Sequence, residues 1–274
     1  MRWYAPFAAL AVCFGACDSP ASPVTVTQSL AATVPERAVV FALDMAGRPL
    51  LGIEHEDRRA AHLPTTYALY RGDEPLDVEP VTAAAYDGPR DRLAWVTADG
   101  ELQVRDDGSF RTIARNVQPG IAFSHNGDAV VFASGIAPEL DVFVARIEDD
   151  SAPSPVAPAA GPQYLPAFDD HAQRVVMASS GALLPVIQIV DRRTAQRRTL
   201  EDAAILPPDG VVAPIWSGST IAYFDGTGVR LIDPDRGGHR LLGGARGVVR
   251  DLDGGLLVVR ASGALTRLTP QEEL

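Results

Sequence analysis

Histidines are the residues of this chain with the most versatile chemistry, because imidazole can act as a metal ligand or as a general base. The chain has five of them: His55, His62, His125, His171 and His239. No two form a His-x-His or His-Glu-x-x-His pair, and no cysteine accompanies them, so their spacing predicts no metal site. His125 and His171 occupy equivalent turn positions of adjacent sequence repeats. Repeat structure therefore explains these two better than ligation does.

Aspartate-rich turns are the second group whose residue types could bind a cation. They are Asp106-Asp107-Gly108, Asp169-Asp170, Asp233-Pro234-Asp235 and Asp251-Leu252-Asp253-Gly254. A calcium loop of the EF-hand type needs alternating carboxylates, a glycine and a glutamate at the twelfth position, and none of these stretches supplies that set. Aspartate and glycine also form turns through side-chain hydrogen bonds and positive φ. We expect ordinary turns, with neither a metal nor a cofactor.

Catalytic motifs are absent from the sequence. Ser217-Gly218-Ser219 lies in a predicted hairpin turn and not between a strand and a helix, so it is no nucleophile elbow, and we expect no catalytic residue from it. Arg192-Arg193 and Arg197-Arg198 bracket another turn, which is either a contact for an anion or headgroup or a solvated hairpin; we favour the hairpin. A catalytic triad is defined in space, so an enzyme remains the alternative.

The charge and cysteine content exclude several classes of function. The formal net charge is −11, which argues against nucleic acid as a partner and against a polybasic grip on lipid. Only Cys13 and Cys17 are present, both near the N-terminus. The rest of the chain therefore has no disulfide, thiolate metal site or cysteine nucleophile.

The first residues have the layout of an export signal. Arg2 is followed by an apolar run that ends in small residues and is shorter than a membrane-spanning helix. Phe14-Gly15-Ala16-Cys17 resembles the bacterial lipobox, which implies that Cys17 is lipidated and becomes the mature N-terminus. Phe14 departs from the usual leucine. We therefore predict a signal peptide at 1–16, a flexible tether at 17–23 and a folded domain at 24–274.

Short apolar runs separated by turns dominate the rest of the sequence, which indicates an all-β chain. The strands that these runs predict would position any site. The stretch Gly120 to Arg146 shows the unit, in which two apolar runs flank Ser124-His125-Asn126-Gly127 and a third run follows. Runs closed by a glycine recur at intervals of 35, 46, 45 and 37 residues, at Gly100, Gly135, Gly181, Gly226 and Gly263. A period of about 40 residues with four short strands predicts a β-propeller blade.

The repeats predict six four-stranded blades closed by an N-terminal strand. Their expected ranges are 37–82, 83–116, 119–157, 163–202, 210–243 and 246–270. Within the first, strands are expected near Ala38–Leu43, Pro49–Glu54, Thr66–Tyr70 and Leu76–Val81. The last range supplies only three runs, so its open edge needs a partner. We expect residues 24–30, which alternate β-branched and polar residues, to be that missing outer strand.

The repeat unit is similar to that of the TolB-like and WD-like β-propellers of bacterial envelope proteins. The match is carried by Ala122-Phe123-Ser124, Gly127, Val130-Val131-Phe132 and Asp141-Val142-Phe143-Val144. His125 and Asn126 stand where that family has Pro-Asp. The resemblance implies a bacterial envelope protein. Together with the lipobox-like stretch that ends at Cys17, it predicts an exported protein that is lipid-anchored to a bacterial membrane and faces the periplasm or the cell exterior. It implies a non-catalytic scaffold that binds another envelope protein or a small ligand; the alternative is a hydrolase or lyase with its site at the channel mouth.

Overall fold

The computed structural model describes residues 25–55, 65–136, 138–149, 151–180, 185–200, 212–251 and 253–269. Apart from one 3-10 turn, η1 (Gly88–Arg90), every regular element in these ranges is a β-strand, which confirms the all-β class. Within the same ranges, no helix is long and apolar enough to cross a bilayer. The predicted lipidation site at Cys17, the predicted signal peptide and the predicted tether lie outside the described residues.

Four sheets have four strands each. The first runs β10 (Ala122–Phe123), β11 (Ala129–Ile136), β12 (Glu139–Arg146), β13 (Ser154–Pro155). The second runs β14 (Gln163–Phe168), β15 (Arg174–Ser180), β16 (Pro185–Asp191), β17 (Arg197–Thr199). The third runs β18 (Ile215–Ser217), β19 (Thr220–Phe224), β20 (Gly228–Ile232), β21 (His239–Gly243). The fourth runs β22 (Ala245–Arg250), β23 (Leu256–Arg260), β24 (Ala264–Thr269), β1 (Thr25–Thr33).

The expected first two blades are joined in one eight-stranded sheet. Its strands are β2 (Ala38–Leu43), β3 (Pro49–Glu54), β4 (Tyr67–Arg71), β5 (Glu74–Pro75), β6 (Val81–Asp87), β7 (Arg92–Thr97), β8 (Leu102–Asp106) and β9 (Ser109–Ala114). The link between its halves is the pairing of Tyr67 with Val81. Six separate blades are therefore not confirmed by the strand pairing, which gives four such blades and this larger sheet.

One expected strand of the first blade is wrong. Leu76–Val81 does not form an outer strand, because β5 occupies only Glu74–Pro75 and Val81 already belongs to β6. Pro75 and Pro80 have no backbone N–H and cannot donate to a ladder, which explains why the pairing stops after two residues.

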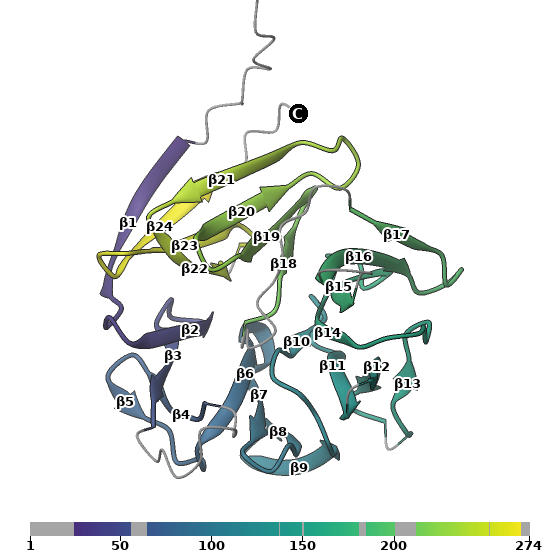
Figure 1. Ribbon diagram of the computed structural model, residues 1–274. Helices are drawn as coiled ribbons and strands as arrows, with labels where there is room; N and C mark the ends of the chain where they lie inside the picture. Colours follow the sequence, from purple (N-terminus) through teal and green to yellow (C-terminus); the bar gives the residue numbers. More distant parts are fainter. Residues whose placement is uncertain are drawn as a thin grey trace, which may run out of the picture.

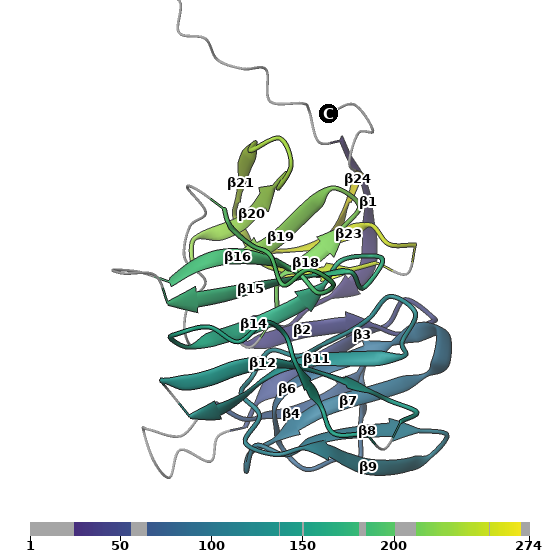
Figure 2. The ribbon, with the colours of Figure 1, turned by 90° about the vertical axis from the view of Figure 1, so that its right-hand side faces the viewer.

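The sheets are arranged around a central axis as a propeller (Figures 1 and 2). Their innermost strands contact one another in the cyclic order β2, β6, β10, β14, β18, β22 and back to β2. The core lies between neighbouring sheets, where Val96 of β7 and Val130 of β11 belong to one buried cluster. Inner strands are covered on both faces, so β6, β7 and β14 read as continuous apolar runs and not as alternating ones.

The ring closes through the N-terminal strand, as expected for residues 24–30. β1 is antiparallel to β24, with Thr25 opposite Thr269 and Thr33 opposite Ala264, and it forms the outermost strand of the last blade. The backbone N–H of Val34 donates to the carbonyl of Gly263 at 2.9 Å. Arg246 of β22 donates to the carbonyls of residues 34, 35, 36 and 38. These contacts tie the start of the chain to its last blade.

Candidate functional site

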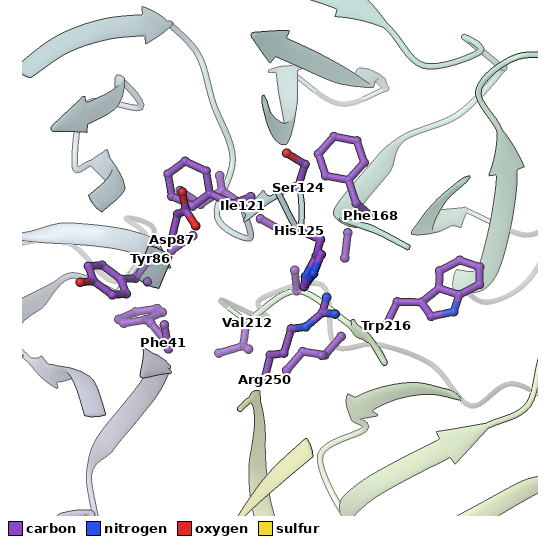
Figure 3. A pocket seen from close by; sticks show the side chains of 18 of the residues that line it. Phe41, Tyr86, Asp87, Ile121, Ser124, His125, Phe168, Val212, Trp216 and Arg250 are labelled. Carbon is purple, nitrogen blue, oxygen red and sulfur yellow. The ribbon is translucent and has the colours of Figure 1, made fainter. Parts of the chain in front are cut away.

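A cavity of about 190 Å³ opens at the centre of the ring, where the innermost strands end (Figure 3). Its wall is mainly apolar and aromatic, and includes Phe41, Ile121, Phe123, Phe168, Val212 and Trp216. Phe132 lies in a buried cluster between blades, whereas Phe123, Phe168 and Trp216 line this cavity. The cavity is the candidate binding site.

A buried polar residue ends each innermost strand or follows it directly. These residues are Asp44, Asp87, Ser124, Asp169, Ser217 and Asp251. In four of the six, the backbone carbonyl accepts a hydrogen bond from the residue three positions later; the pairs are Asp44–Gly47 (2.8 Å), Ser124–Gly127 (2.8 Å), Asp169–Ala172 (3.0 Å) and Asp251–Gly254 (3.0 Å). Because different blades share this turn, their equivalent residues lie around the mouth of the same cavity.

This turn geometry corrects the expected equivalence of His125 and His171. Because Ser124 matches Asp169, His125 matches Asp170, and His171 matches Asn126. His125 is exposed and lines the cavity, whereas His171 does not line it. Repeat structure alone therefore does not account for His125. In the described parts of the chain, no three histidine, cysteine, aspartate or glutamate side chains come close enough to hold a metal ion.

Arg250 is the cation at the mouth of the cavity. Figure 3 shows its guanidinium and the His125 ring pointing toward one another. Arg250 donates to Asp170, and the second oxygen of Asp170 accepts the backbone N–H of Gly218 at 2.8 Å. Arg250 was not predicted as a site residue, and Asp170 was expected only as part of a turn. A comparison of the residues that precede each polar turn residue would have found Arg250.

Asp87 is one of two buried carboxyls that line the cavity, and the other is Asp251. Burial raises the pKa of Asp87, although Arg90 and Arg92 act against that effect. Its Oδ2 atom has no hydrogen-bond partner among the described residues, and an Arg90 nitrogen lies 3.9 Å away. A β-carbon built on Gly127 would lie 1.8 Å from this oxygen, so the carboxyl packs directly on the Gly127 backbone. Asp87 is therefore held between two blades.

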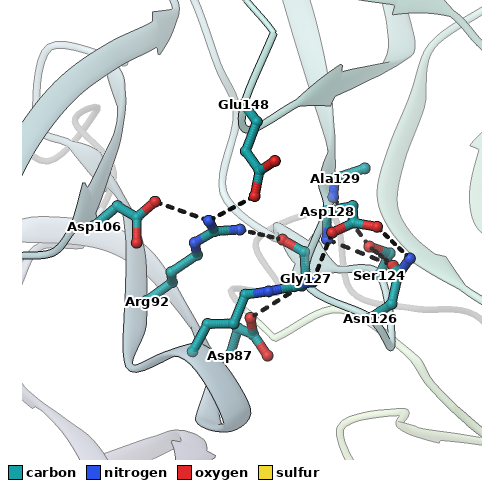
Figure 4. A network of polar contacts seen from close by, with 10 residues as sticks. Asp87, Arg92, Asp106, Ser124, Asn126, Gly127, Asp128, Ala129 and Glu148 are labelled. Atoms are coloured by element: carbon teal, nitrogen blue, oxygen red, sulfur yellow. Dashed lines mark hydrogen bonds and ion pairs between the residues drawn. The ribbon is translucent and has the colours of Figure 1, made fainter.

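Arg92 fixes the turn that carries His125 (Figure 4). Its guanidinium donates to the Gly127 carbonyl at 3.1 Å and pairs with Asp106 at 2.9 Å and Glu148 at 3.1 Å. The hydrogen bond to Asp106 is the main reason that the pKa of Arg92 is raised. The contacts join β7 and β8 to the turns on either side of β11 and β12. The network therefore positions one side of the cavity mouth.

Tyr86 also lines the cavity, but its hydroxyl is engaged elsewhere. The hydroxyl donates to Asp91 at 2.6 Å, and the Arg71 guanidinium lies over the ring at 5.2 Å from its centre. Burial and the hydrogen bond to Asp91 raise its pKa. Tyr86 therefore stays protonated at physiological pH and serves as part of the wall.

Two further stretches that the sequence predicted to be hairpin turns are turns in the structure. Ser217-Gly218-Ser219 belongs to a tight turn in which Ser217 pairs with Thr220, and the Ser217 hydroxyl donates to the Gly254 carbonyl at 2.6 Å. Arg192 and Arg193 are exposed in the turn between β16 and β17. Arg192 donates to the Ala172 carbonyl at 2.6 Å, so this arginine is tied to the neighbouring turn.

Comparison with known proteins agrees with the architecture. No protein-family model matches the sequence, and no curated protein is significantly similar to it. Among solved structures, TolB from Acinetobacter baumannii superposes with a TM-score of 0.54 at 14% identity, over 85% of this chain and 63% of TolB. A putative TolB from Agrobacterium tumefaciens gives 0.60 at 14% identity, over 85% of this chain and 91% of that one. This chain has the fold of the TolB-like β-propellers. At these identities, the likeness concerns the fold alone.

A solved structure whose name does not mention TolB is also similar to this chain. A chain from the nidogen/laminin complex gives a TM-score of 0.55 at 15% identity, over 81% of this chain and 85% of that one. The chain spans 63% of the length of the Acinetobacter TolB. The TolB-like propeller fold thus agrees with the resemblance of the repeat unit around Phe123 and Gly127.

Proposed function

We propose that this protein is a bacterial cell-envelope lipoprotein whose propeller binds another protein or a small ligand at the mouth of the central cavity, without catalysis. The observation that carries the proposal is the cavity itself, which combines an aromatic wall with the exposed side chain of His125 and the partly exposed side chain of Arg250. Mixed apolar and convergent polar linings are typical of binding sites. The nidogen/laminin match supports protein binding, because that chain comes from a complex of two proteins.

The position of β1 is compatible with an anchor at Cys17. β1 is the outermost strand of its blade, whereas the cavity is lined by innermost strands and the turns that follow them. A lipid attached at Cys17 would therefore be connected to the outer edge of the ring. The mouth of the cavity would stay open to a partner.

A second candidate, an enzyme with its site at the channel mouth, is favoured by one observation. Asp87 combines a raised pKa with a place in the cavity wall, as catalytic carboxyls often do. Its Oδ2 atom is, however, packed against Gly127. Of the polar side chains that line the cavity, Tyr86 and Ser124 already donate hydrogen bonds within the protein. Binding therefore fits the site better than catalysis.

Mass spectrometry of the mature protein from bacterial membranes tests the anchor. We expect a mass of residues 17–274 plus acyl chains, which Cys17→Ser abolishes. Cys13→Ser is the matched control, since this cysteine lies in the predicted signal peptide, and the mature mass should not change. A soluble, unacylated wild-type product would refute the anchor.

Site-specific photo-crosslinking in intact cells tests the binding face. A crosslinker at His125 reports on the cavity mouth, and one at Thr227 reports on an exposed turn at the opposite end of the blade, between β19 and β20. We expect a discrete crosslinked partner from position 125 that is missing from position 227. Equal capture at both positions, or capture at position 227 alone, would contradict binding at the mouth.

A further inference from the structure

One residue departs from the repeat at the rim of the cavity. The residue directly before the polar turn residue is apolar or aromatic in five repeats, at Leu43, Tyr86, Phe123, Phe168 and Trp216, and it is arginine at position 250 in the sixth. All six line the cavity. Five repeats place an apolar or aromatic residue here, so the blade fold does not require a charged one. Arg250 therefore gives the rim of the cavity a positive charge that the blade itself does not require.

The charges around Arg250 leave it able to bind an anion. Among the described residues, Asp170 alone accepts a hydrogen bond from Arg250, and a guanidinium has five N–H donors. Asp170 is also held by the Gly218 backbone N–H. Asp251, the other carboxylate beside Arg250, forms an ion pair with Arg267. The Arg250 side chain is 28% exposed, so its free donors are available at the mouth.

The size of the cavity limits what can enter beside that cation. Its volume of about 190 Å³ is smaller than the roughly 300–1,000 Å³ typical of pockets for drug-sized ligands. It is close to the roughly 150 Å³ of an apolar cavity that holds benzene. The space therefore suits one apolar side chain or a group of that size.

We propose that the cavity binds a carboxylate carried next to a single apolar side chain, as in the C-terminal residue of a polypeptide or in a free N-acyl amino acid. The apolar group would contact Phe41, Phe123 and Phe168. The carboxylate would accept hydrogen bonds from Arg250, and His125 faces the same space (Figure 3). A guanidinium that pairs with a carboxylate at the edge of an apolar pocket gives both affinity and orientation. This inference rests on the proposed function as a binding protein and names the chemistry that it recognises.

Calorimetric titration of the full-length, membrane-extracted protein tests the inference with matched probes. N-acetyl-L-leucine carries the carboxylate, and N-acetyl-L-leucinamide replaces it with a neutral amide of nearly the same size. We expect the acid to bind at least about tenfold more tightly than the amide, since a charge-assisted hydrogen bond is lost with the amide. A hexapeptide ending in leucine, with a free or an amidated C-terminus, distinguishes the two sources. Tighter binding of the free peptide than of the small acid would indicate a chain end, and equal or weaker binding would indicate a free acid.

Three variants assign the binding to Arg250. Arg250→Gln should weaken binding of N-acetyl-L-leucine at least about tenfold. Asp170→Asn should strengthen it, by about threefold, because it removes the carboxylate that competes for Arg250. Arg230→Gln is the matched control: Arg230 is 23% exposed and pairs with Asp225 at the other end of a blade, so affinity should not change.

Arg250→Gln is expected to weaken binding and Asp170→Asn to strengthen it. Misfolding cannot produce both results, because a poorly folded Asp170→Asn protein cannot gain affinity. Equal affinity for acid and amide, no binding of either, or an unchanged affinity in Arg250→Gln would overturn the inference. If partner crosslinking at His125 persists in that case, only the carboxylate chemistry fails. If that crosslinking is missing as well, binding of another protein at the mouth, as proposed above, fails too.

Discussion

Replacing Arg92 with methionine tests whether this arginine holds neighbouring blades together at the cavity. The Arg92 side chain is 7% exposed and contacts the Gly127 carbonyl, Asp106 and Glu148 (Figure 4). Methionine keeps most of the buried side-chain volume, so the change removes the charge and the donors without opening a large cavity. The Gly127 carbonyl would lose this buried partner.

The expected loss in the free energy of unfolding follows from the solvent exposure of each partner of Arg92. Glu148 is 71% exposed and can return to water, so this pair contributes less than about 0.5 kcal/mol. Asp106 is 36% exposed, and its pair contributes about 1 kcal/mol. The charge-assisted bond to the buried Gly127 carbonyl contributes about 1.5–2 kcal/mol. We expect Arg92→Met to lower the free energy of unfolding by about 3 kcal/mol.

Urea denaturation followed by far-UV circular dichroism measures this loss. Arg115→Met is the control: Arg115 is 77% exposed and pairs with Glu101 at 3.3 Å, so its change should stay within about 0.5 kcal/mol. Amide hydrogen exchange should also accelerate at Gly127, which lies in the turn that carries His125. A loss below about 1 kcal/mol for Arg92→Met would refute the reasoning, because buried ion pairs can be replaced by apolar residues at little cost.

Three further predictions follow from the closure of the ring and from the contacts at Asp87. Deleting residues 24–30 removes most of β1 and exposes the edge of β24, so the thermal unfolding midpoint of the whole domain should fall; an unchanged midpoint would show that β1 is dispensable. Gly127→Ala should destabilise more than Gly47→Ala in urea denaturation: both have positive φ, but only at Gly127 would the new β-carbon meet Asp87. Burial raises the pKa of Asp87, so the folded state holds this proton more tightly than the unfolded state, and stability falls as pH rises from about 4 through the raised pKa. Asp87→Asn should lose less stability than the wild type between pH 4 and pH 7, and equal losses would contradict this assignment.

Short-range patterns in the sequence were enough to predict much of the fold. Asn126-Gly127 between two β-prone runs predicted a hairpin, because a turn with positive φ needs glycine, and Gly127 has φ +66°. The recurrence of the unit predicted a propeller. The three runs of the last blade left an open edge, and only one alternating stretch, residues 24–30, was available to pair with it.

The tertiary structure decided what lies at the centre of the ring. Phe123, Phe168 and Arg250 are far apart in the sequence and meet only because their strands end around one axis. Pairing of Tyr67 with Val81, which merges two expected blades, depends on the path of the chain between β4 and β6 and leaves no local pattern. Local residue types thus fix strands and turns through backbone preference. Which side chains share a cavity depends on closure of the whole ring. No short stretch of sequence encodes the spatial proximity of residues on different blades.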